Sequence, residues 1–409
     1  MCKDTNEKYA LSKYVEVIEY GNQFILFNKL NGGIVLMDSD KICFNDTDTY
    51  LTCLKEMELE YLTEEHFFAD EQSVQKYIAD NLKFAQTGGN TNIVISVTEK
   101  CNLNCKYCYQ SDWDRHEKID DREYLLLLVE YIKSILPKIY ETNGRLLIQF
   151  IGGEPLLKKK LILEIKEAID SLNIYGVDVY YTIDTNIMFL TREFLEQFKK
   201  ITINTTLTAP HDHNRLRSNS YDAVLERLQE LAGLFEQENY KLTIRYNVHQ
   251  DNVAELESVI DVLEGMNLKF AMDVQNITNT EGAVFKNKLS DEDFDEIYLN
   301  QIAPILQKHS LEPDVLPQYG ISRHCSASNK LNCKFYANGR KVLCNAMFKT
   351  LKEMQEEYLP ELPEMCIRCI DFPYCGGPKL CEPECSGAFR DKEGVRQRII
   401  KYVQLCGEE

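Results

Sequence analysis

The sequence predicts an α/β protein with a partial barrel of six parallel strand–helix units at its centre. Strand-like and amphipathic helical runs alternate through the middle of the 409-residue chain, with a period of roughly 25–35 residues. This alternation implies right-handed crossovers and a parallel sheet, in which reactive groups gather at the carboxyl ends of the strands. The length is too great for one small core, so we expect two or three domains.

The barrel is assigned to residues 92–311. Helical periodicity separates its predicted strands, as in residues 221–235, where apolar residues recur every three or four positions. Six segments rich in β-branched and aromatic residues form these strands: 92–97, 145–151, 177–183, 200–207, 241–248 and 268–274.

Residues 1–91 predict a smaller α+β domain. Alternating segments at 14–20, 24–28 and 33–37 are separated by Gly21-Asn22 and Asn31-Gly32-Gly33, which favour tight hairpin turns. An acidic helical stretch is expected over residues 47–84, and Gly88-Gly89-Asn90 predicts a linker. A hairpin with an open edge can accept an extended leader peptide as an added strand. The alternative is that the hairpin merely caps the barrel.

The charge of the chain argues against a nucleic acid partner. The formal net charge is −19, whereas a protein that binds a polyanion needs a basic surface. The opening residues carry no basic-then-apolar signal peptide, and no run of about 18 apolar residues could span a bilayer. We therefore expect a cytoplasmic protein with no membrane or nucleic acid partner.

Fifteen cysteines are unusual for a chain of this size and composition. In a small secreted protein they would form disulfides, but in a reducing cytosol they predict metal ligands. Their distribution supports metal binding, because three lie in one short loop and nine lie in the last 85 residues.

Cys101, Cys105 and Cys108 follow the first predicted barrel strand with the spacing C-x3-C-x2-C. Thiolates are natural ligands of iron–sulfur clusters, and three on one loop leave the fourth iron of a cubane open. An open iron can be chelated by the amino and carboxylate groups of a small molecule, whose carbon–sulfur bond breaks when the cluster donates an electron. The alternative is structural zinc, which needs four ligands, and His116 is the only histidine nearby.

This loop, with Tyr107 before its last cysteine, resembles the radical S-adenosylmethionine (SAM) superfamily. The second strand ends in Gly152-Gly153-Glu154-Pro155, which is similar to the GGEP motif of that superfamily. The resemblance implies that this motif meets the amino group of SAM, because glycines let a backbone approach and the Glu154 carboxylate pairs with an ammonium. It also implies that the three cysteines hold the catalytic [4Fe-4S] cluster.

Later strand ends resemble other SAM contacts of the superfamily. Thr185-Asn186 is similar to a Thr-Asn-Gly turn, and Thr206 replaces a serine hydroxyl. Relatives carry an aspartate where this chain has Thr208, so the sequence departs from the pattern there. Arg215 is either a partner of the SAM carboxylate or a surface residue. Three further strand-end residues either line the cavity or satisfy polar groups of the barrel: Asn247, Asp273 and Gln275.

Residues 312–409 lose this periodicity, so bound metal must supply much of their folding energy. The array of cysteines there resembles the SPASM domain of peptide-modifying radical SAM enzymes. Lys379 occupies the position of one family cysteine, and two zinc ribbons are the alternative. The resemblance implies two auxiliary [4Fe-4S] clusters, the first held by Cys325, Cys333, Cys344 and either Cys381 or Cys385, the second by Cys366, Cys369, Cys375 and Cys406.

The resemblance implies a maturase that cleaves SAM to a 5′-deoxyadenosyl radical and abstracts a hydrogen from a precursor peptide. An intramolecular thioether is the favoured product, with an auxiliary cluster taking up the released electron, and a carbon–carbon bond is the alternative. The expected partners are a precursor peptide with its leader and a flavodoxin- or ferredoxin-like electron donor.

Three other functions stay open. Anaerobic sulfatase-maturing enzymes, which make formylglycine, carry an acidic residue directly after the Gly-x4-Cys cysteine, where Asn345 follows Cys344. A peptide epimerase would need a hydrogen-donor thiol, for which the ninth C-terminal cysteine is a candidate. A non-catalytic metal-binding scaffold would hold zinc and cleave no SAM.

Overall fold

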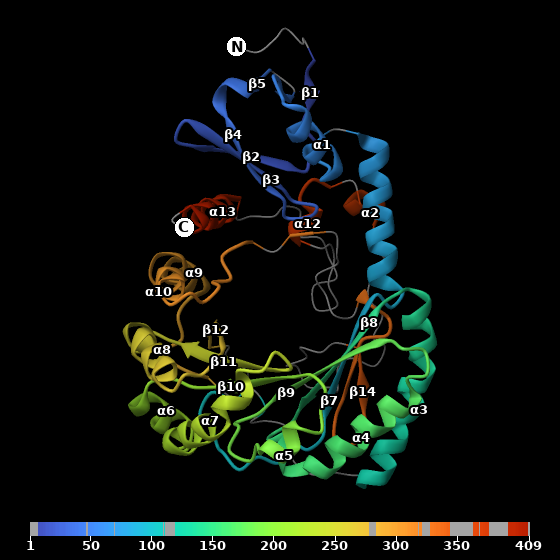
Figure 1. Ribbon diagram of the computed structural model, residues 1–409, viewed down its shortest axis with the longest axis vertical. Helices are drawn as coiled ribbons and strands as arrows, with labels where there is room; N and C mark the ends of the chain where they lie inside the picture. Colours follow the sequence, from blue (N-terminus) through green and yellow to red (C-terminus); the bar gives the residue numbers. More distant parts are fainter. Residues whose placement is uncertain are drawn as a thin grey trace. The chain divides into compact units, whose positions relative to one another are not determined.

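The chain forms two compact units, each described here by itself (Figure 1). The first contains residues 1–86, 315–328 and 358–409, and the second contains residues 87–314 and 329–357. The computed structural model describes residues 7–45, 48–68, 70–108, 110, 119–277, 284–317, 319–320, 328–343, 363–367, 369–375 and 392–407.

The second unit is built on a parallel sheet, as the sequence predicts. Six of its strands run in the order β12-β11-β10-β9-β8-β7, and every neighbouring pair among them is parallel. The last strand begins three residues later than expected, at Ala271 rather than residue 268. The strands are β7 (Asn90–Ser96), β8 (Arg145–Ile151), β9 (Asp178–Asp184), β10 (Ile201–Thr206), β11 (Tyr240–Val248) and β12 (Ala271–Asn276).

Two short strands from the C-terminal part of the chain extend this sheet. β13 (Cys333–Phe335) pairs in parallel with β7, and β14 (Lys341–Val342) pairs antiparallel with β13. The expected third domain, 312–409, is therefore divided between the two units. The physical reason is that β13 supplies hydrogen-bond partners to the edge of β7, with Cys333 opposite Ile93.

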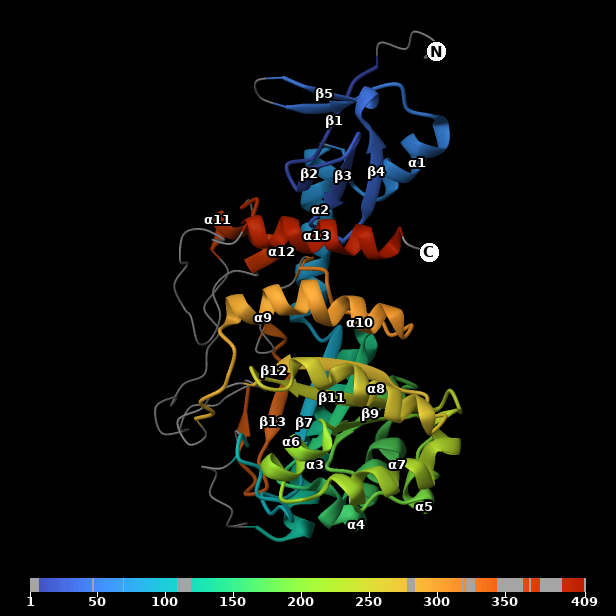
Figure 2. The same cartoon turned by 90° about the vertical axis from the view of Figure 1, so that its left-hand side faces the viewer.

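Apolar helices cover one face of the parallel sheet and leave the other face polar. Along β11, buried Leu242 and Ile244 alternate with more exposed Thr243 and Arg245, which is the period of two expected of a strand. Helices α3, α4 and α7 lie along the outer side of the sheet in both views (Figures 1 and 2). The helices are α3 (Asp121–Glu141), η2 (Pro155–Lys158), α4 (Lys159–Leu172), α5 (Arg192–Leu195), α6 (Pro210–Leu216), α7 (Tyr221–Phe235), η3 (Val253–Glu255), α8 (Leu256–Gly265), α9 (Asp291–Ile297), the π-helix η4 (Tyr298–Ile302) and α10 (Ala303–Lys308).

The first unit contains two three-stranded antiparallel sheets, ordered β2-β3-β4 and β1-β6-β5. Gly21 and Gly32 have φ angles of 61° and 79°, so glycine fits the two predicted turns. The predicted helical stretch 47–84 is wrong at its start, because Thr49–Leu51 pairs with two other strands. The elements before the barrel are β1 (Tyr9–Ala10), β2 (Val15–Tyr20), β3 (Gln23–Asn28), β4 (Ile34–Asp38), η1 (Ser39–Lys41), β5 (Ile42–Phe44), β6 (Thr49–Leu51), α1 (Glu56–Glu64) and α2 (Glu71–Gln86).

The last helices of the chain complete the core of this first unit. They are α11 (Glu364–Ile367), α12 (Phe372–Cys375) and α13 (Lys392–Cys406). Ile25 and Phe27 of β3 pack with Val395 and Ile399 of α13, and all four side chains are buried. Across both units, no helix in the described ranges is long and apolar enough to cross a membrane.

Candidate active site

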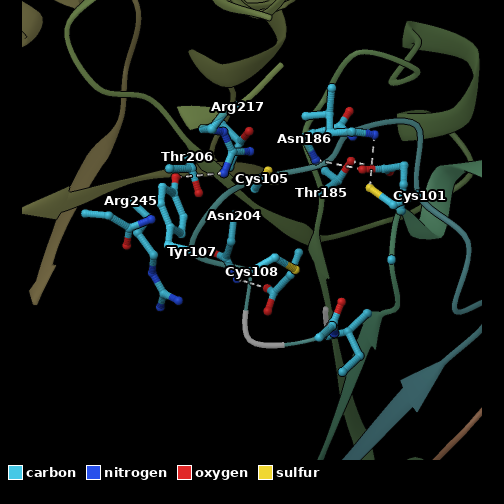
Figure 3. A pocket seen from close by; sticks show the side chains of 18 of the residues that line it. Cys101, Cys105, Tyr107, Cys108, Thr185, Asn186, Asn204, Thr206, Arg217 and Arg245 are labelled. Carbon is cyan, nitrogen blue, oxygen red and sulfur yellow. Dashed lines mark hydrogen bonds between the residues drawn. The ribbon is translucent and has the colours of Figure 1, made fainter. Parts of the chain in front are cut away.

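The three predicted cluster cysteines line one cavity at the carboxyl ends of the parallel strands (Figure 3). Cys101, Cys105 and Cys108 form no disulfide within the described ranges, and the cavity has a volume of about 490 Å³. This volume is typical of a site for a small molecule or cofactor. Among the described residues, these thiols do not form a group whose ligand atoms all lie within 4.8 Å of one another. That spread suits a multinuclear cluster better than a single zinc ion.

Gly152 and Gly153 hold the cysteine loop against the end of β8. A Cβ on Gly152 would lie 2.2 Å from the carbonyl oxygen of Thr98, and one on Gly153 would lie 2.4 Å from that of Lys100. The N–H of Gly153 donates to Thr98 at 2.8 Å, and the N–H of Glu154 donates to Lys100 at 2.8 Å. The backbone that approaches these glycines is therefore the chain's own cysteine loop, which the sequence alone did not indicate.

Glu154 is almost fully buried and accepts three hydrogen bonds from the protein. The Thr185 hydroxyl and the N–H of Leu156 donate to Oε1 at 2.6 and 3.0 Å, and the N–H of Asn186 donates to Oε2 at 2.8 Å. Burial raises the pKa of Glu154, and these donors oppose that shift. A carboxylate has about four acceptor positions, so one remains for the expected ammonium of SAM. Pro155 is buried at the start of η2.

Thr185 and Asn186 join the end of β9 to the neighbouring loops. Besides its bond to Glu154, the Thr185 hydroxyl accepts from the N–H of Ile187 at 3.0 Å. The side-chain amide of Asn186 donates to the side-chain oxygen (Oδ1) of Asn102, inside the cysteine loop, at 2.7 Å. Both residues line the cavity, so the turn predicted from the sequence lies where a SAM contact is expected.

Arg217, rather than Arg215, supplies a cation to the cavity. Arg215 pairs with the Asp212 carboxylate at 2.6 Å, and it is not among the lining residues. Arg217 is 8% exposed, lines the cavity and donates to the Tyr107 hydroxyl at 3.2 Å. Burial lowers the pKa of Arg217, but Tyr107 and Cys105 favour its charge more strongly, so the pKa lies above its usual value.

Polar residues of the concave sheet face form the floor of the cavity. Thr206, Asn247 and Gln275 line it, as the sequence allows. Asp273 is not among the lining residues and accepts two hydrogen bonds from Arg245, at 2.7 and 2.9 Å.

Asp184 is a lining residue whose chemistry was not predicted from the sequence. Its carboxylate accepts from the side-chain amides of Asn204 at 2.7 Å and Gln149 at 2.9 Å. No cation pairs with it in the described part of the chain, and burial raises its pKa. The available signal was its place beside Thr185-Asn186, at the end of a strand. Arg217 was missed because Arg215 lies nearer the motif.

The described C-terminal cysteines fall into two places. Cys333 is fully buried on β13 in the second unit, and burial raises its pKa to about 12. The other four belong to the first unit: Cys366, Cys369, Cys375 and Cys406. The remaining predicted ligands lie outside the described residues: Cys325, Cys344, Cys381 and Cys385.

The cavity suits the cofactors that the sequence implies. Arg217, a buried residue of its lining, has an Nε atom with no hydrogen-bond partner in the described ranges. An unpaired buried donor costs about 1–3 kcal/mol, so a polar ligand that accepts a hydrogen bond from this atom would stabilise the site. Three thiols suit a cluster with one open iron. The charge of Arg217 is opposite to that of an amino acid's carboxylate, and the charge of Glu154 is opposite to that of its ammonium.

Residues 95–263, which include the cysteine loop and most of the strands around this three-thiol cavity, match the Radical SAM superfamily. The cyclopropyl synthase TigE of Paramaledivibacter caminithermalis, itself named a radical SAM protein, is 25% identical over 267 residues, which cover 58% of this chain and 56% of that protein. The GTP 3′,8-cyclase of Campylobacter jejuni is 31% identical over 159 residues, covering 37% of this chain and 45% of that enzyme. The chain thus spans only about half the length of these relatives.

Two solved structures share the fold. Native anSMEcpe with bound AdoMet and Cp18Cys peptide has a TM-score of 0.53 and 16% identity, covering 78% of this chain and 97% of that chain. SuiB of Streptococcus suis bound to S-adenosylmethionine has a TM-score of 0.50 and 16% identity, covering 89% of this chain and 88% of that chain.

Proposed function

We propose that this radical SAM enzyme modifies a peptide and forms an intramolecular crosslink, with a thioether as the favoured product. The observation that carries the proposal is the long polar face that runs along the sheet into the three-thiol cavity, because an extended peptide has polar groups along its whole length. The fold shared with anSMEcpe, solved with a bound peptide, supports a substrate of the same class.

Cys101, Cys105 and Cys108 would hold the [4Fe-4S] cluster, while Glu154 and Arg217 would orient SAM. When bound, these cofactors supply a 5′-deoxyadenosyl radical that removes a hydrogen atom from the peptide. The protein excludes water and keeps the peptide carbon in place. Glu154 is restrained by Thr185 and Asn186, so its position does not depend on the ligand.

Asp184 is the proposed proton acceptor. In thioether formation the thiol of the peptide bonds to the carbon radical, releasing one proton and one electron. The Asp184 carboxylate would accept the proton, and an auxiliary iron–sulfur cluster held by the C-terminal cysteines would supply an acceptor for the electron. Two neutral amides hold this carboxylate without neutralising it, and burial raises its pKa, which makes it a stronger base than an exposed aspartate.

The C-terminal cysteines are proposed to hold two auxiliary clusters, as in a SPASM domain. Cys333 would contribute to the first cluster together with cysteines outside the described residues. Cys366, Cys369, Cys375 and Cys406 would form the second, and all four belong to the same unit. Their proposed role is electron transfer, because a cluster with four protein thiolates has no open iron.

The first unit is proposed to bind the leader of the precursor peptide at the edge strand β4. Among the described strands, β4 pairs only with β3, so its other edge is open. Leu36 on β4 is 45% exposed and offers an apolar contact. The opposite edge strand, β2, has its Glu16 carboxylate paired with Arg396 of α13 at 3.0 Å. An added strand at β4 would gain backbone hydrogen bonds.

The decisive experiment uses the anaerobically reconstituted full chain with SAM and dithionite. We expect 5′-deoxyadenosine to form. If a small peptide is encoded beside the gene, co-expression with it should give a product two hydrogens lighter. Deuterium placed at the target carbon of that peptide should appear in 5′-deoxyadenosine. Absence of 5′-deoxyadenosine would contradict the radical reaction, and conversion of GTP with an unchanged peptide would replace the peptide by a nucleotide substrate.

A further inference from the structure

A second cavity, of about 860 Å³, lies at the amino ends of β9 to β12. Aromatic rings form part of its wall, including those of Tyr180, Tyr181 and Phe270. Tyr180 is 41% exposed, so a ligand in this cavity can reach its ring. None of the cluster cysteines or expected SAM contacts lines this cavity, so it is separate from the site described above.

Three lysines give this cavity a positive charge. Lys200, Lys241 and Lys269 line it, and Glu238 is the one acidic residue of the described lining. None of the three lysines forms a hydrogen bond or ion pair with a described residue. This is notable in a chain with a net charge of −19, where Lys41, Lys158 and Lys166 all pair with carboxylates. Like charges around one cavity repel, and an anionic ligand would relieve that repulsion.

The polar face of β11 contributes residues to both this cavity and the three-thiol cavity. Lys241 lies opposite Thr202 in the strand register, so both side chains point to the same face. On the same face of β11, Arg245 and Asn247 follow Lys241 at even spacing and line the three-thiol cavity. From Lys241 to Asn247 the strand rises about 20 Å, the length of roughly six residues of extended peptide.

From this arrangement we infer that the lysine-lined cavity binds an acidic segment of the substrate peptide, about six residues from the residue that is modified. The inference rests on the proposed peptide substrate. The ammonium groups would pair with glutamate or aspartate side chains, and the aromatic wall would contact their neighbours. The intervening residues of the peptide would lie along the polar face of β11, between the lysine-lined cavity and the three-thiol cavity.

Binding of defined peptides to the reconstituted full chain tests the inference without knowledge of the natural substrate. The probes are fluorescein-labelled hexaglutamate, hexaglutamine and hexalysine, measured by fluorescence anisotropy. We expect hexaglutamate to bind most tightly. The combined substitutions Lys200→Glu, Lys241→Glu and Lys269→Glu should weaken it about tenfold or more, because three ion pairs are lost.

A matched control separates a local site from the overall charge. Lys133, Lys138 and Lys286 are exposed residues outside the cavity, and their replacement by glutamate changes the net charge by the same amount. The control should leave the dissociation constant of hexaglutamate within about twofold. Equal weakening by both triple variants, or equal binding of hexaglutamine, would overturn the inference. So would tripolyphosphate, which has no carboxylate, displacing the label better than free hexaglutamate.

The same variants keep this inference distinguishable from the proposed function. Formation of 5′-deoxyadenosine from SAM without peptide should be unchanged in the lysine variant, because no substituted residue lines the three-thiol cavity. Loss of hexaglutamate binding with normal SAM cleavage supports the inference. Normal hexaglutamate binding in the lysine variant refutes it and leaves the proposed radical chemistry standing.

Discussion

Arg217 donates a hydrogen bond of 3.2 Å to the hydroxyl of Tyr107, and this contact fastens the end of α6 to the cysteine loop. Two backbone groups of the loop make parallel contacts. The N–H of Lys106 donates to the Leu216 carbonyl at 3.0 Å, and the N–H of Asn104 donates to the Ser218 hydroxyl at 2.9 Å. The segment that follows the fourth strand therefore positions the expected cluster ligands.

Substitution of Arg217 should impair SAM cleavage far more than substitution of Arg215. Arg217→Gln removes a buried cation from the cavity, and we expect the rate of 5′-deoxyadenosine formation to fall about tenfold to a hundredfold. Arg215→Gln breaks a partly exposed pair with Asp212, so it should lower thermal stability slightly and leave cleavage near normal. The reverse order of effects would return the role of SAM partner to Arg215.

Gly153→Ala should disrupt the cysteine loop, because the new Cβ would lie 2.4 Å from the Lys100 carbonyl oxygen. We expect loss of about 1–3 kcal/mol of stability and a lower iron content after reconstitution. Gly233→Ala is the matched control, since no atom lies within 4 Å of its added Cβ in α7. That change should stabilise the helix by about 1 kcal/mol. Unfolding curves and iron assays compare the two variants.

Replacing Cys101, Cys105 and Cys108 by alanine should abolish SAM cleavage, since no other described thiol lines this cavity. Exposed Cys43, in the first unit, provides the matched control, and Cys43→Ala should retain full activity. Iron and sulfide content should fall by about one cubane in the triple variant, leaving auxiliary clusters in place. Residual 5′-deoxyadenosine in the triple variant would show that SAM binds elsewhere.

Asp184→Asn should separate hydrogen abstraction from product formation. Deuterium transfer from peptide to 5′-deoxyadenosine should persist, while the crosslinked peptide falls about a hundredfold or more, the usual effect of losing a general base. Burial raises the pKa of Asp184, with Arg245 lowering it and Asp273 raising it. Only the ionised form accepts a proton, so product formation in the native enzyme should increase as pH rises through that pKa. An unchanged pH profile in the variant would argue for a purely structural carboxylate.

The parallel sheet and its carboxyl-end cavity could be predicted because both follow from local patterns. Buried Ile203 and Leu242 sit at the alternating positions that a strand packed on helices requires. The spacing of Cys101, Cys105 and Cys108 likewise predicts three thiols in one loop.

The remainder depends on contacts between residues far apart in the chain. Cys333 of β13 lies opposite Ile93 of β7, although the two residues are 240 positions apart in the sequence. No local sequence pattern predicts such a pairing. The same holds for Arg217, whose partner Tyr107 lies 110 residues away. The sequence indicates Gly152 and Gly153 as sites of close backbone approach to SAM, whereas the backbone that lies against them is that of the cysteine loop. These contacts depend on tertiary packing, so they cannot be predicted from the spacing of residues along the sequence.

The dependence of β3 on α13 has a consequence for biosynthesis. Ile25 and Phe27 emerge from the ribosome long before Val395 and Ile399, which cover them in the finished protein. At about 5–20 residues per second the intervening stretch takes roughly 20–70 s to make, so α13 cannot cover these apolar side chains while the barrel is synthesised. A nascent chain at that stage exposes apolar surface that chaperones bind. Helix α13, which is made last, covers the side chains of β3, which are made first.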